Sequence, residues 1–70
     1  MNQVSRPYSL SPREREVLAL IGAGKANKEI AIETGMTYNT VKIHVRSVLQ
    51  KMGVHSRTLA AIKYLQEDKG

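Results

Sequence analysis

Apolar side chains recur at helical spacing along most of the chain, and glycines interrupt them at intervals. The first such segment opens with Ser11, Pro12 and Glu14. The serine can cap a helix, proline suits the first helical position, and the glutamate completes a capping box. We therefore predict a helix that starts after Ser11 and ends at Gly22 and Gly24. Its apolar face consists of Val17, Leu18 and Ile21.

The same signals predict three further helices. Asn27 is a favourable N-cap for a short second helix, which Gly35 stops after about two turns. Thr37 caps a longer third helix from residue 38 to about residue 52, closed by Gly53. Ser56 caps a fourth helix, which reaches about residue 65.

These elements make the chain one all-α domain. No segment alternates with period two, so we expect no strand and no winged helix. Seventy residues suffice for one domain. We predict a flexible arm or linker remnant over residues 1–9, a compact four-helix domain over residues 10–66, and a frayed tail over residues 67–70.

The second and third predicted helices have the spacing of a helix-turn-helix. This motif needs a small residue inside its first helix, a glycine at the turn and a branched apolar residue inside its second helix. Ala31, Gly35 and Val41 meet these needs, and Gly35 can adopt the positive φ of such a turn. Ile30 and Met36 flank the turn and are expected to fill the space between the helices.

The third predicted helix has two chemically distinct faces when residues are placed about 100° apart. The core stripe consists of Val41, Val45, Val48, Leu49 and Met52. The opposite face consists of Asn39, Lys42, Ile43, Arg46 and Gln50. No acidic residue occurs between residues 38 and 52. A helix with one apolar face and one neutral or cationic face suits a polyanion such as DNA.

The outer face also has the chemistry to read bases in the major groove. Lys42 and Arg46 can donate to guanine. Ile43 can contact a thymine methyl group, and Asn39 can pair with adenine or hold a phosphate. Helix starts supply phosphate contacts, because their first amides are unpaired. The residues expected to contact phosphate are Asn27, Lys28, Thr37, Tyr38, Thr40, His44 and Lys51.

Composition narrows the function further. Eleven Lys and Arg against six Asp and Glu give a net charge of +5, which by itself fits nucleic acid, an anionic membrane or simple solubility. The chain has no Trp or Phe to anchor it on a membrane and no apolar run that could span one. We expect a cytoplasmic protein, nucleoid-associated when bound to DNA.

Metal and enzyme chemistry have little support in the sequence. There is no cysteine, and His44 and His55 have no partners at ligand spacing, so we expect no metal and no other cofactor. No nucleophile–base pair, phosphate loop or set of paired carboxylates indicates an enzyme.

Four segments resemble the LuxR/GerE-type DNA-binding domain, the output module of NarL/FixJ response regulators and quorum-sensing regulators. The segments are LSPREREVL, NKEIA, TVKIHVRSVLQKMGV and SRTLAA, in the order and spacing of that family, within residues 10–65. The resemblance implies a four-helix, sequence-specific DNA-binding domain of a bacterial transcription regulator. It also implies base contacts from Lys42, Ile43 and Arg46.

The resemblance further implies that the fourth helix pairs with its equivalent in a second copy on an inverted-repeat operator. One short helix offers little contact area, so we expect a weak homodimer that DNA strengthens. Contact with RNA polymerase is a further expectation. The residues expected at the pairing contact are Leu59, Ala60, Ile62, Lys63 and Tyr64.

Several positions depart from the family pattern. Thr34 stands where leucine is common, and its hydroxyl can donate to the Ile30 carbonyl. Ile32 stands where a polar residue is usual. Tyr38 replaces a frequently acidic or small residue, and we expect it to contact the DNA backbone.

Two other functions fit the same residues. A sigma-factor region that recognises a promoter element shares the helix-turn-helix and the start of the first helix, although the SRTLAA segment disfavours it. A protein-interaction antagonist would use the fourth helix to pair with a full-length regulator of the resembling family.

Overall fold

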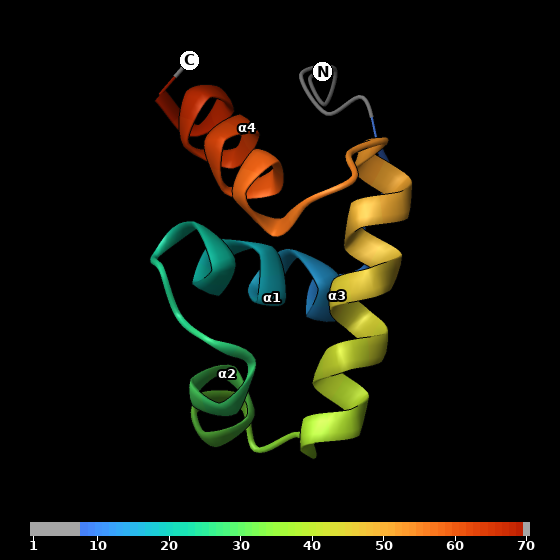
Figure 1. Cartoon of the computed structure of the whole chain (residues 1–70), viewed down its shortest axis with the longest axis vertical. Helices are drawn as coiled ribbons and strands as arrows, with labels where there is room; N and C mark the ends of the chain where they lie inside the picture. Colours follow the sequence, from blue (N-terminus) through green and yellow to red (C-terminus); the bar gives the residue numbers. More distant parts are fainter. Residues whose placement is uncertain (1–7, 70) are drawn as a thin grey trace.

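The computed structural model describes residues 8–69, which form four helices (Figure 1). These are α1 (Pro12–Gly22), α2 (Asn27–Thr34), α3 (Tyr38–Met52) and α4 (Arg57–Lys69). Since the described residues contain no strand, the predicted all-α class is confirmed. None of these four helices is long and apolar enough to cross a bilayer.

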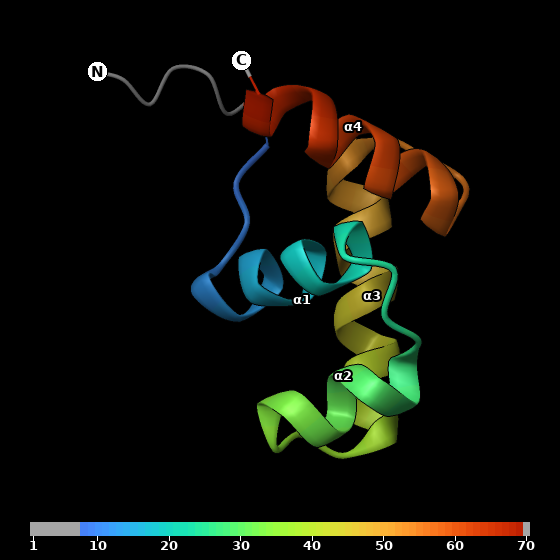
Figure 2. The ribbon, with the colours of Figure 1, turned by 90° about the vertical axis from the view of Figure 1, so that its left-hand side faces the viewer.

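Figures 1 and 2 show α1 crossing α3 near its middle, with α4 and α2 near opposite ends of α3. α1 packs against both α3 and α4, and α2 packs against α3. α3 is thus supported along its length from one side, and its other side faces outward.

Three predicted helix caps are confirmed. The Ser11 hydroxyl accepts the Glu14 amide at 3.1 Å, and the Glu14 carboxylate accepts the Ser11 amide at 2.8 Å. The Thr37 hydroxyl accepts the Thr40 amide at 3.1 Å, and Ser56 in the same way accepts the third amide of α4 at 3.1 Å. These bonds satisfy backbone donors that have no partner inside a helix.

The predicted cap of α2 is wrong by one residue. Ala26 is the N-cap, and Asn27 is the first helical residue. The Glu29 carboxylate accepts the Ala26 amide at 2.7 Å, which holds the chain at the helix start without a capping side chain. The side chain of Asn27 therefore serves another contact.

The turn between α2 and α3 follows the prediction closely. Gly35 has a φ of +77°, and its amide donates to the Ala31 carbonyl at 2.9 Å. The Thr34 hydroxyl donates to the Ile30 carbonyl at 2.7 Å, as expected. The same oxygen accepts the Met36 amide at 3.3 Å, so one side chain ties the end of α2 to the turn.

Two small apolar clusters form the core. One joins α1 to the helix-turn-helix, and the other joins α1 to α3 and α4. The first contains Val17, Ile21, Ile30 and Val41. The second contains Leu18, Val48, Met52 and Ala60. The predicted apolar faces of α1 and α3 are confirmed, with Val45 and Leu49 half-buried at the edges.

Both ends of the domain differ from the prediction. α4 continues to Lys69, about one turn beyond its expected end, so the tail expected to fray is helical as far as that residue. Tyr8 packs against the second core cluster, and its hydroxyl donates to the Glu67 carboxylate. The expected arm therefore does not include Tyr8, and the rest of that prediction, residues 1–7, lies outside the described residues.

Candidate nucleic-acid interface

The outer face of α3 is exposed, as the helical pattern predicted. All five of its side chains lie in solvent, including Ile43 at 66% exposure. At this exposure most of the apolar surface of the isoleucine is available to a partner. The five residues are Asn39, Lys42, Ile43, Arg46 and Gln50.

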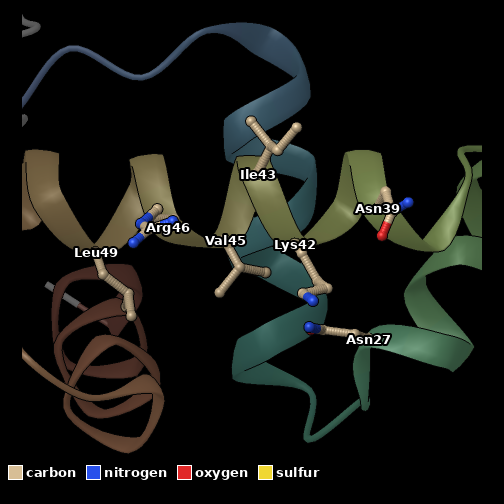
Figure 3. Close-up of a pocket in the computed structure, with 7 residues that line it drawn as sticks. All are labelled: Asn27, Asn39, Lys42, Ile43, Val45, Arg46 and Leu49. Carbon is tan, nitrogen blue, oxygen red and sulfur yellow. The ribbon is translucent and has the colours of Figure 1, made fainter.

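An open groove lies along this face of α3 (Figure 3). Its lining brings all four predicted base-contacting side chains together with Asn27 of α2. Half-buried Val45 and Leu49 contribute the apolar part of the lining. The lining is Asn27, Asn39, Lys42, Ile43, Val45, Arg46 and Leu49.

The first turn of α3 holds a cation in place. The Lys42 ammonium lies 5.7 Å from the centroid of the Tyr38 ring, one turn away along the helix. A cation over an aromatic face is worth about 0.5–1 kcal/mol at an exposed site. The first turn of α3 has no acidic side chain that would compete for this ammonium or repel an anion.

Thr37 and Thr40 are bound to each other at the start of α3. Besides its cap, the Thr37 hydroxyl donates to the Thr40 hydroxyl at 2.9 Å. Thr37 is exposed and Thr40 is half-buried. The helix geometry leaves the first amides of α3 without intrahelical acceptors, so this helix start can attract an anion.

Arg57, which the sequence pattern did not single out, ties the start of α4 to the start of α2. One Arg57 nitrogen donates to Asn27 Oδ1 at 2.7 Å, and the other donates to the Lys25 carbonyl at 2.7 Å. Thirty residues separate Arg57 from Asn27, so no local spacing could reveal the pair. The sequence marks Arg57 only as the residue that directly follows the Ser56 cap.

The carboxylate of Glu14 lies in a buried polar cluster between α1 and α3, with 6% exposure. Ser47 donates to it at 2.5 Å and Lys51 at 2.9 Å. These bonds and the Ser11 amide, with Ser47 the largest influence, lower the pKa of Glu14 from 4.5 to about 2. Lys51 was predicted to contact phosphate, but its ammonium is already bound to this internal carboxylate.

Lys28 and His44, two other predicted phosphate contacts, have different environments. Lys28 is exposed in the first turn of α2. His44 is half-buried on α3. Across residues 8–69, no three His, Cys, Asp or Glu side chains come together in a way that could hold a metal ion.

The predicted pairing residues of α4 divide between surface and core. Leu59 and Ile62 are 47% and 44% exposed, and Leu65, which was not predicted, is 50% exposed. Ala60 is completely buried in the second core cluster, so its predicted place at a surface contact is wrong.

The other two predicted pairing residues also have partners inside the domain. Tyr64 packs against the second core cluster and beside Gly22 of α1, so most of its ring serves the fold. The Lys63 ammonium lies 5.9 Å from the centroid of the Tyr8 ring.

Comparison with known families gives one match that spans most of the chain. The family described as bacterial regulatory proteins, luxR family, matches residues 8–64. The match includes α1, α2, α3 and the greater part of α4.

Curated relatives match over the same part of the chain. The "Nitrate/nitrite response regulator protein NarL" of Escherichia coli (strain K12) is 48% identical over 58 residues, which are 83% of this chain and 27% of that protein. The "Transcriptional regulatory protein LiaR" of Bacillus subtilis (strain 168) is 50% identical over 54 residues, 77% of this chain and 26% of that protein. A "Nitrate/nitrite response regulator protein homolog" of Haemophilus influenzae (strain ATCC 51907 / DSM 11121 / KW20 / Rd) is 39% identical over 61 residues, 87% of this chain and 29% of that protein. The chain thus spans less than a third of the length of each.

Proposed function

Because the chain belongs to the luxR family of bacterial regulatory proteins, we propose that it places α3 in the major groove of double-stranded DNA and reads its sequence there. Membership makes the chain a DNA-binding domain of a transcription regulator, in a family of regulators rather than of enzymes. The observation that carries the proposal is the exposed face of α3. None of the 15 residues of this helix has a negative charge. A polyanion meets no electrostatic penalty along this face.

The base contacts come from the groove-lining side chains of α3. Arg46 and Lys42 donate to guanine, the first with the geometry to bind O6 and N7 together. Ile43 contacts a thymine methyl group, which would account for its exposure. Asn39, one turn before Ile43, pairs with adenine or holds a phosphate.

The phosphate contacts come from the starts of α2 and α3, each of which contributes one residue, Asn27 or Asn39, to the groove lining. The first amides of α2 and α3 are oriented toward a partner outside the helix. His44 stays a prediction, and Lys51 is left out because Glu14 binds its ammonium. The proposed phosphate contacts are Asn27, Lys28, Thr37, Tyr38 and Thr40.

The exposed apolar row on α4 is the proposed site of pairing between two copies on an inverted repeat. Leu59, Ile62 and Leu65 follow one another at spacings of three residues, which places them along one side of the helix. Lys63 lies at the edge of this row. Since one helix buries far less than a stable interface requires, we expect a monomer in free solution and cooperative pairing on DNA.

A titration with duplex DNA tests the proposal. Affinity for a random-sequence duplex should fall linearly with salt on logarithmic axes, because cationic side chains release counterions from phosphate. Selection of bound fragments from a random pool should then enrich an inverted repeat. The proposal fails if the purified chain has no salt-sensitive affinity for any duplex.

The exposed row on α4 also favours a second function, that of an antagonist which pairs with another regulator of the family. Gel filtration of the chain mixed with a full-length relative distinguishes the two. An antagonist forms a mixed complex without DNA and removes the relative from its operator. A DNA reader forms no such complex at micromolar concentration.

A further inference from the structure

We propose that Arg57 is a positioning residue that determines which end of the Asn27 side-chain amide faces DNA. This inference rests on the proposed function and goes beyond it, because it assigns a role in DNA binding to a residue of α4 that does not line the groove.

The chemistry of the two side chains leaves one arrangement. A guanidinium has donors only, whereas an asparagine amide has one oxygen that accepts and one nitrogen that donates. The Arg57 nitrogen 2.7 Å from the amide therefore requires the oxygen at that position. The amide nitrogen must then point the other way.

Arg57 is itself held firmly enough to impose this orientation. Its other terminal nitrogen donates to the Lys25 carbonyl at 2.7 Å. The two bonds leave the planar guanidinium little freedom to rotate, and bonds to a charged donor are about twice as strong as neutral ones. Arg57 and Asn27 are both half-buried, so water competes for the bond only in part.

The free end of the amide faces the groove in which the proposed function places DNA. Figure 3 shows the nitrogens of Asn27 and Lys42 pointing into the same groove. Neither nitrogen can accept a hydrogen bond from the other, so both need an acceptor from outside. A phosphate oxygen supplies one. An amide turned by 180° would instead present its carbonyl oxygen and repel the phosphate.

The substitution Asn27→Asp separates folding from binding. Aspartate keeps an oxygen for Arg57 and adds an ion pair, and it suits the first turn of a helix. Its second oxygen replaces the donor in the groove by a negative charge. We expect an unchanged or higher melting temperature, together with a loss of affinity for a fluorescent random-sequence duplex of about tenfold or more.

A double-mutant cycle then tests Arg57 directly. Arg57→Lys keeps the net charge but replaces the planar two-nitrogen donor by one ammonium, and it should weaken binding about threefold. Asn27→Ala should weaken binding by a similar or larger factor. If Arg57 acts through Asn27, the double substitution binds as Asn27→Ala does. Without DNA, the side-chain amide resonances of Asn27, identified by their loss in Asn27→Ala, should shift in Arg57→Lys.

Additive losses in the cycle would overturn the inference, because Arg57 would then act on DNA or on stability independently of Asn27. Undiminished binding by Asn27→Asp, or amide resonances that do not move in Arg57→Lys, would overturn it as well. An unsubstituted chain that binds no duplex would overturn the proposed function and the inference with it. If only the inference fails, the unsubstituted chain still binds duplex DNA.

Discussion

The Lys51 ammonium lies 2.9 Å from the Glu14 carboxylate, so an ion pair joins the C-terminal half of α3 to the first turn of α1. The Ser47 hydroxyl, one turn earlier on α3, binds the second oxygen of the same carboxylate at 2.5 Å. One buried side chain thereby caps α1 and holds α3 against it. The orientation of the exposed face of α3 depends in part on this cluster.

Replacement of Glu14 by glutamine should destabilise the fold without unfolding α3 locally. The drop in pKa from 4.5 to about 2 corresponds to roughly 3 kcal/mol of stabilisation of the charged form. We expect Glu14→Gln to lower the free energy of unfolding by this order in urea at neutral pH. Glu16→Gln is the matched control, since among residues 8–69 Glu16 forms an exposed ion pair with Arg13. This substitution should change stability by less than about 1 kcal/mol.

The contribution of Glu14 should also depend on pH in a defined window. Its folded pKa lies below its ordinary value, so in acid the unfolded chain takes up the proton first. The stabilisation is complete above about pH 4.5 and is lost as the pH falls toward 2. The difference in stability between the unsubstituted chain and Glu14→Gln should shrink over this range. A difference that stays constant over this range would contradict the conclusion that folding lowers the pKa of Glu14.

Single substitutions on α3 should separate base contacts from the fold. Arg46→Ala or Lys42→Ala should cost about 1–3 kcal/mol at a selected DNA site and relax base preference there. Melting temperatures should change little, because both side chains are exposed. Ile32→Ala, which removes a side chain 79% exposed on α2 outside the groove, should footprint like the unsubstituted chain. If Arg46→Ala and Lys42→Ala also give the footprint of the unsubstituted chain, α3 does not read the DNA sequence.

Gly22 is required by its neighbour rather than by its own backbone. A Cβ at this position would lie 2.5 Å from Tyr64 Cδ2 and 3.0 Å from Cε2. Alanine normally stabilises a helix relative to glycine by about 1 kcal/mol, but here we expect Gly22→Ala to destabilise the domain by about 1–3 kcal/mol in denaturant unfolding. In a Tyr64→Leu background the penalty should largely disappear. An equal penalty in both backgrounds would exclude the ring as its cause.

The apolar row on α4 should affect pairing but not folding. Leu59→Glu or Ile62→Glu places a charge on the exposed side, so the fold should persist while cooperative binding to an inverted repeat is lost. Ala60→Leu, in contrast, adds volume to a fully buried site and should cost about 1–3 kcal/mol of stability. Gel-shift titrations and thermal melts measure the two effects. Unchanged cooperativity in both glutamate variants would exclude this row.

Local signals in the sequence were sufficient for much of the fold. Ser11, Thr37 and Ser56 cap the helices as predicted, because a cap bonds to an amide only a few residues away. Gly35 marked the turn for the same reason, since its backbone conformation is a property of one residue. The division of α3 into two faces followed from helical periodicity alone.

Contacts between distant segments could not be predicted in this way. The Lys51–Glu14 and Arg57–Asn27 bonds join residues 37 and 30 positions apart, and nothing in either neighbourhood specifies the partner. The local sequence around a charged side chain near a helix end is the same whether that side chain binds a phosphate or a group inside the protein. Which of these holds depends on how the helices pack.

Tyr8 and Glu67 bring the first described residue and the last turn of α4 together, at the pole opposite the α2–α3 turn (Figure 2). A surface anchor, a fluorescent reporter or a neighbouring protein module joined directly before Tyr8 or directly after α4 would therefore start from that pole. Both junctions lie away from the side chains that line the groove, so a domain immobilised through either junction should keep its binding face open to DNA.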